Sequence, residues 1–142
     1  MRQLTPYILQ DLQKKMVFVS GPRQCGKTTL AKSLLKNDSG LYLNWDRISD
    51  RKRILNGDWT DQDRILLLDE IHKYRKWKTL IKGFYAPEKD IHQFLVTGSA
   101  RLDIYQRGGD SLLGRYHSWR LHPFSLYDLP KGLTAHEGLR RL

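Results

Sequence analysis

Apolar residues along the chain alternate between short strand-like runs and stripes at helical spacing. The strand-like runs are rich in Val, Leu, Ile, Phe and Tyr, and they cover 16–20, 41–45, 64–68, 94–97 and 116–121. Apolar spacing and turn signals predict helices over 5–15, 27–36, 46–55, 74–86 and 101–105, and a capping-box pattern predicts a further helix start at 125–128. Strands that alternate with helices predict an α/β domain with a parallel sheet and helices on both faces.

Two helix boundaries rest on proline. Thr5 followed by Pro6 favours a helix start in which Thr5 is the N-cap and Pro6 occupies the first helical position. Pro87 lacks a backbone N–H and clashes with the preceding turn, so we expect the helix that begins near residue 74 to end before it.

The sharpest motif in the chain directly follows the first predicted strand. The octet GPRQCGKT at 21–28 fits the pattern G-x-x-x-x-G-K-[ST], and an apolar helical stripe follows it. In this pattern the glycines let the backbone approach a phosphate, the lysine contacts the β- and γ-phosphates, and the final hydroxyl binds Mg²⁺. We therefore assign nucleotide binding to Gly21, Pro22, Arg23, Gln24, Cys25, Gly26, Lys27, Thr28 and Thr29.

A second part of the site is predicted where the third strand ends. The run LLL at 66–68 is followed by Asp69 and Glu70, so an apolar strand delivers two carboxylates to its exit. A phosphate–Mg²⁺ site needs a carboxylate near the metal, which suits Asp69 together with Thr28. Hydrolysis also needs a base that orients the attacking water, and Glu70 is the candidate. Gly21, Asp69 and Gly98 all follow strand ends, so we expect them at one edge of the sheet.

Composition limits the class of protein and its partners. The chain has 142 residues, with 25 Lys and Arg against 15 Asp and Glu and a formal net charge of +10. Such a charge favours anionic partners, a nucleotide first and nucleic acid second, although a solubilising surface explains it equally well. No apolar run approaches the roughly 18 residues that span a bilayer. The single cysteine, Cys25, excludes an intrachain disulfide framework, so we expect a cytoplasmic protein without membrane association.

Four segments together carry a family resemblance. GPRQCGKTTL (21–30), LLLDEIHK (66–73), LVTGSARLDIY (95–105) and SLLGRYHSWRLHPFSL (111–126) resemble the ATPase domain of AAA-family proteins. More narrowly, they resemble a prokaryotic group in which this domain precedes a C-terminal domain of unknown function. The resemblance implies ATP and Mg²⁺ as ligands. It also implies the P-loop nucleoside triphosphate hydrolase fold, with three α/β/α layers and a mostly parallel five-stranded sheet in the order 5-1-4-3-2.

The resemblance also implies roles for single residues. Residues 21–28 correspond to the Walker A loop, in which Lys27 is also catalytic, and Asp69 and Glu70 correspond to the Walker B pair. Ser99 lies where the family places a polar sensor of the γ-phosphate, with Thr97 as second choice. Arg115 lies where AAA proteins often place an arginine finger that acts on a neighbouring subunit, with Arg101 as the weaker alternative. A homo-oligomer would then be needed for full activity.

The resemblance leads us to place the domain boundaries as follows. Residues 1–131 form the ATPase domain, with an N-terminal helix at 1–15 and the core at 16–131, and residues 132–142 form a tail. Because relatives continue beyond this point, we expect a truncated core without the helical lid that carries a "sensor 2" arginine. Three functions remain open: an ATPase, a nucleotide-binding module with little turnover, and a basic ATPase fragment associated with nucleic acid. The partner besides ATP also remains open between nucleic acid and a protein.

Overall fold

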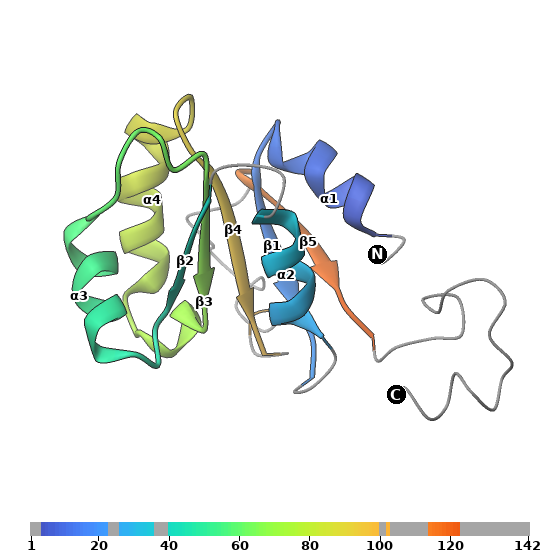
Figure 1. The fold of residues 1–142 in the computed structure, drawn as a ribbon, viewed down its shortest axis with the longest axis horizontal. Coiled ribbons are helices and arrows are strands. Elements are labelled where there is room, and N and C mark those ends of the chain that lie inside the picture. Colours follow the sequence, from blue (N-terminus) through green and yellow to red (C-terminus); the bar gives the residue numbers. More distant parts are fainter. Residues whose placement is uncertain (1–3, 23–25, 36–39, 100–101, 103–113, 123–142) are drawn as a thin grey trace, which may run out of the picture.

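The computed structural model describes residues 4–22, 26–35, 40–99, 102 and 114–122. Within these residues, helices and strands alternate along the chain (Figure 1). In chain order the elements are α1 (Thr5–Leu12), β1 (Met16–Ser20), α2 (Lys27–Leu35), β2 (Gly40–Asn44), α3 (Ile48–Asn56), β3 (Ile65–Asp69), the 3-10 helix η1 (Ile71–Lys73), α4 (Trp77–Glu88), β4 (Gln93–Gly98) and β5 (Tyr116–Arg120).

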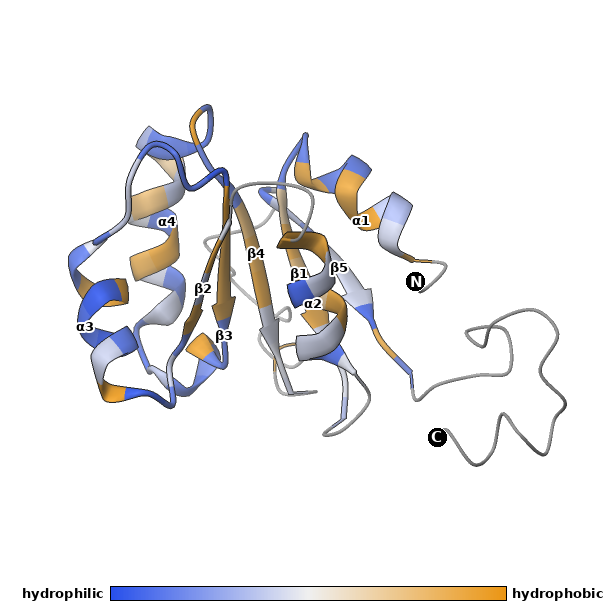
Figure 2. Ribbon diagram, viewed as in Figure 1, coloured by the Kyte–Doolittle hydropathy of each residue, from blue (hydrophilic) through white to orange (hydrophobic). Residues whose placement is uncertain are grey.

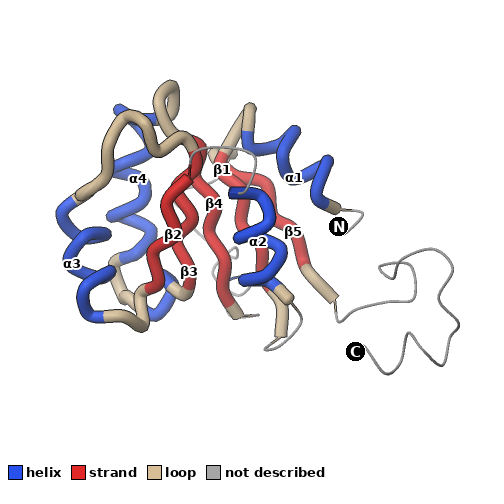
Figure 3. Tube along the Cα trace, in the orientation of Figure 1, coloured by secondary structure: helices blue, strands red, loops and turns tan. Residues whose placement is uncertain are grey.

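The strands form one five-stranded sheet in the order β2-β3-β4-β1-β5. Every neighbouring pair is parallel, and β1 lies between β4 and β5. Read from the other edge, this is the expected order 5-1-4-3-2, so the predicted fold class is confirmed. Because all strands run the same way, their carboxyl ends meet at one edge of the sheet, as the arrows in Figure 1 show. Figure 3 shows the five strands side by side.

Two apolar cores cover the two faces of the sheet. One core joins Ile8 of α1 and Leu30 of α2 to alternate strand residues such as Leu67. The other joins Ile54 of α3 and Ile81 of α4 to the strand residues that face the opposite side of the sheet, such as Leu66. Figure 2 shows the apolar stripes of the helices beside the central strands. The molecule therefore has three layers, with α1 and α2 on one face and α3 and α4 on the other.

Strand β3 contributes to both cores because its first four residues are apolar. Ile65 and Leu67 belong to the α1–α2 core, whereas Leu66 and Leu68 belong to the α3–α4 core. All four side chains are fully buried. A strand covered on both faces needs a continuous apolar run, and that run is what the sequence shows.

Shortening a side chain in β3 should be costly. We expect Leu67→Ala to lower the free energy of unfolding by about 3 kcal/mol, since it removes buried methyl groups and leaves a cavity. Urea unfolding followed by circular dichroism measures this. Ile48→Ala is the control, because Ile48 is 71% exposed and its loss should change stability by less than about 0.5 kcal/mol. Equal effects of the two substitutions would contradict the assignment of Leu67 to the core.

Both proline-based boundaries are wrong. Helix α1 begins at Thr5 itself with Leu4 as N-cap, and the Thr5 side chain is buried without a capping hydrogen bond. The helix also ends at Leu12, short of 15, because the chain turns there to enter β1. Helix α4 continues through Pro87 to Glu88, where a proline in the last turn forgoes a single hydrogen bond. The predicted helices at 101–105 and 125–128 lie outside the described residues, apart from Leu102.

Candidate nucleotide-binding site

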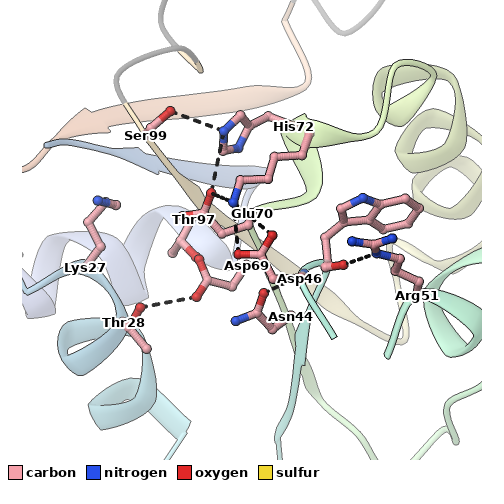
Figure 4. Close-up of polar contacts among 12 residues, drawn as sticks. Lys27, Thr28, Asn44, Asp46, Arg51, Asp69, Glu70, His72, Thr97 and Ser99 are labelled. Atoms are coloured by element: carbon pink, nitrogen blue, oxygen red, sulfur yellow. Dashed lines mark hydrogen bonds and ion pairs between the residues drawn. The ribbon is translucent and has the colours of Figure 1, made fainter. Parts of the chain in front are cut away.

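The carboxyl ends of three strands bring the predicted site residues together. Gly21 follows β1, Asp69 ends β3, and Ser99 follows β4. Residues Ser20 and Gly98 are partners in the β1–β4 pairing, and Asp69 and Thr97 are partners in the β3–β4 pairing. Figure 4 shows Asp69 of β3 beside Thr28 of α2, together with Thr97 and Ser99 from the end of β4. The expected gathering at one edge of the sheet is what the structure shows.

The loop between β1 and α2 is bent by glycine and occupied by its own lysine. Gly26 has φ of 88°, a backbone conformation that residues with a side chain rarely adopt. The Lys27 side chain is buried, and its Nζ donates hydrogen bonds of 2.8 Å to the carbonyl oxygens of Gly21 and Pro22. Arg23, Gln24 and Cys25 lie outside the described residues, and Thr29 is exposed. The lysine ammonium thus lies inside the loop, where an anion would meet it.

Asp69 is the polar centre of the site and accepts hydrogen bonds from three hydroxyl groups. Thr28 Oγ1 donates to Asp69 Oδ2 over 3.2 Å, and this bond links the start of α2 to the end of β3. Thr97 Oγ1 of β4 donates to Oδ1 over 2.7 Å. Tyr42 OH of β2 donates to Oδ2 over 2.6 Å. Asp69 is only 4% exposed, and these bonds are what make its burial tolerable.

Sequence reasoning missed Tyr42. Its residue type fitted a strand, and nothing in its neighbourhood suggested a polar role. The signal that could have found it is the sheet order, because β2 beside β3 places alternate residues of β2 next to Asp69. Burial, followed by the hydrogen bond to Asp69, raises the pKa of Tyr42 well above its usual value. The phenol therefore keeps its proton and donates a hydrogen bond to the carboxylate.

Glu70 lies in a separate group of polar side chains and has a strained backbone. Its φ of 62° is unusual for a residue with a side chain, and its N–H donates to the Thr97 carbonyl over 2.9 Å. Its Oε2 lies 3.5 Å from Lys73 Nζ and 3.6 Å from His72 Nε2. Lys73 also binds both Asp46 oxygens, at 2.8 and 2.9 Å, and this hydrogen bonding raises the pKa of Lys73. The neighbouring carboxylates of Asp69 and Glu70 therefore contact different groups of side chains.

The two residues proposed for sensing the γ-phosphate make different contacts. Thr97 is fully buried and bonds Asp69. Ser99 is partly exposed, and its Oγ lies 3.2 Å from His72 Nε2. Through His72, the Ser99 side chain is thus connected to the Glu70 group and not to Asp69.

Arg115 lies where the strands β1 and β5 begin, at the end of the sheet opposite the phosphate loop. Its carbonyl oxygen accepts a hydrogen bond from the N–H of Met16, the first residue of β1. The five residues of β1 then span about 16 Å before the phosphate loop begins. Arg115 cannot reach the loop of its own chain. By contrast Arg120, which sequence analysis did not single out, pairs with Ser20 directly before the loop.

A parallel sheet in this order, with a glycine-bent loop after a central strand and a carboxylate at the end of β3, defines the P-loop nucleoside triphosphate hydrolase fold. A family model described as AAA domain matches residues 13–129, most of the chain. The chain therefore belongs to this AAA domain family, whose members are nucleotide-binding modules. The resemblance seen in the four sequence segments is confirmed.

Among solved structures, the fold is similar to unliganded Pif1 from Bacteroides sp, with a TM-score of 0.52 and 15% sequence identity. That alignment covers 85% of this chain and 41% of the other, so this chain spans less than half of that protein. At this identity the likeness shows the fold alone. No curated protein matches the chain. Within the described residues, none of the helices is long and apolar enough to cross a membrane.

Proposed function

We propose that this AAA domain binds ATP together with Mg²⁺ and hydrolyses it. The observation that carries the proposal is the 3.2 Å contact between Thr28 Oγ1 and Asp69 Oδ2. It brings the hydroxyl that ends the loop motif together with the carboxylate of β3, and Thr28 directly follows Lys27 in the chain. Phosphate and Mg²⁺ need this set of groups at one place.

The residues present fit both ligands. Mg²⁺ prefers oxygen ligands, and Thr28 and Asp69 supply a hydroxyl and a carboxylate. When bound, Mg²⁺ would neutralise part of the negative charge on the phosphates. Lys27 now donates to two loop carbonyls, and these bonds would be exchanged for stronger ones to phosphate. The N–H groups at the start of α2 add partial positive charge. The site thus offers positive charge to the phosphates and oxygen ligands to the metal.

In the proposed hydrolysis Glu70 orients the attacking water and accepts its proton. Its partly exposed side chain is accessible to water, and its contacts with Lys73 and His72 limit the directions it adopts. Ser99 is proposed to hydrogen-bond the γ-phosphate or the water. The network Glu70–His72–Ser99 supports this, because it would link a change at the phosphate to the base.

Assembly and partners belong to the same proposal. Arg115 lies too far from its own loop, so a finger role requires a second copy of the chain. The formal charge of +10 supports an anionic partner, and nucleic acid is the class we propose. The single cysteine supports a reducing, cytoplasmic setting.

Calorimetric titration of the 142-residue chain with ATP, with and without Mg²⁺, tests binding directly. Saturable binding that Mg²⁺ strengthens is the expected result, and absence of binding would refute the proposed function. Steady-state release of inorganic phosphate then separates an ATPase from the alternative, a nucleotide-binding module. A rate equal to that of buffer alone would favour the module.

A further inference from the structure

The Tyr42 hydroxyl contacts the same oxygen of Asp69 that Thr28 contacts. Tyr42 OH lies 2.6 Å from Asp69 Oδ2, and Thr28 Oγ1 lies 3.2 Å from it. The sheet register explains this contact: Asn44 pairs with Asp69 and Tyr42 with Leu67. Alternate residues of a strand share a face, so Tyr42 projects toward α2 as Asp69 does. The phenol thus reaches the carboxylate along the face on which the loop lies.

The Tyr42 side chain is itself held in place. Asn44 Nδ2 donates a hydrogen bond of 3.3 Å to the phenol oxygen. Lys32 Nζ of α2 lies 4.6 Å from the centre of the ring, and the guanidinium carbon of Arg47 lies 6.0 Å from it. Cations at these distances are attracted to the face of an aromatic ring. An amide and two cations therefore fix the direction in which the hydroxyl donates.

The hydrogen bonds on Asp69 differ in what they can do once a metal is present. Thr28 and Asp69 are both assigned to Mg²⁺, so the Thr28 hydroxyl is needed as a ligand. Tyr42 and Thr97 are not assigned as metal ligands, and they donate to different oxygens, Oδ2 and Oδ1. Two donors on the two oxygens fix the plane of a carboxylate. The 2.6 Å bond from Tyr42 has the length of a charge-assisted hydrogen bond.

We propose that Tyr42 is a positioning residue that orients the Asp69 carboxylate toward Mg²⁺ through its hydroxyl. It touches neither the nucleotide nor the metal and acts through Asp69. The inference rests on the proposed function, since it assigns a role in binding Mg²⁺ with ATP. Groups that orient metal ligands typically change metal affinity by about 10- to 100-fold when removed.

Tyr42→Phe tests the inference, because it removes the hydroxyl and keeps the ring that packs beside α2. The affinity for ATP is measured by calorimetry in EDTA and over a series of Mg²⁺ concentrations. We expect the Mg²⁺ concentration for half-maximal strengthening of ATP binding to rise about 10-fold, while ATP affinity in EDTA stays the same. Tyr85→Phe is the matched control, since Tyr85 lies on α4 at the other face of the sheet.

Each outcome decides a different point. An unchanged Mg²⁺ dependence in Tyr42→Phe would overturn the inference and leave the proposed function intact. An equal loss of affinity with and without Mg²⁺ would also overturn it, because a structural role alone would produce that result. Wild-type protein that binds no ATP would refute the proposed function itself. Asn44→Ala removes the hydrogen bond from Asn44 Nδ2 to the phenol oxygen and should shift the Mg²⁺ dependence less, in the same direction. If Tyr42→Phe does not fold, Asn44→Ala becomes the test, and an unchanged Mg²⁺ dependence in that variant would overturn the inference.

Discussion

Lys27→Ala should weaken ATP binding by about 100-fold or more. The Lys27 side chain is 8% exposed, and its ammonium lies within a loop whose carbonyls already hold it at 2.8 Å. Bound phosphate would take the place of those carbonyls and bring a larger charge. A hydrogen bond to a charged group contributes about 1.5–3 kcal/mol, so losing two of them from a buried cation removes at least about 3 kcal/mol of binding. Calorimetric titration with ATP and Mg²⁺ measures the loss.

A matched control separates the loop from general charge. Lys14→Ala removes the same charge from the turn between α1 and β1, at the opposite edge of the sheet. We expect it to leave ATP affinity within about twofold, since exposed charges at that distance are screened by salt. A thermal melt monitors folding of both variants. Equal weakening by both substitutions would show that ATP binds through net charge and would refute the loop as the site.

The backbone of this site could be predicted from the sequence because each part has a local signal. The run 65–69 is apolar at every position until Asp69, which is the pattern of a strand buried on both faces. The glycine that the loop motif places at 26 does adopt a positive φ. The sheet order followed from the family resemblance, since apolar runs say nothing about which strands are neighbours.

The side-chain network could not be predicted, because it depends on register between strands. Tyr42 and Thr97 meet at Asp69 from two strands that lie on either side of β3. The positive φ of Glu70 has no signal either, since glutamate rarely adopts that conformation. It arises where the chain leaves β3 and turns into η1, with the Glu70 N–H held by the Thr97 carbonyl. Pro87 shows the same limit for a helix end, because α4 continues one residue past it to Glu88.

Glu70→Gln should separate hydrolysis from binding. We expect phosphate release to fall by about 100-fold or more, because a general base typically contributes 10²–10⁴-fold and an amide cannot accept the proton. ATP affinity should stay within about threefold, since the carboxylate lies with Lys73 and His72 and not with the Thr28–Asp69 pair. Steady-state phosphate release and calorimetry on the same preparation measure the two quantities.

Glu88→Gln is the control for this prediction, because Glu88 accepts a hydrogen bond from Trp59 at the end of α4, away from the loop. Its turnover should match the wild type. The pair of variants also tests the separation of the two neighbouring carboxylates. If Glu70→Gln weakens ATP binding as strongly as it slows release, then Glu70 acts on the bound nucleotide or its metal and not on water. If release is unchanged while ATP still binds, another group activates the water, and His72 beside Ser99 is the next residue to substitute.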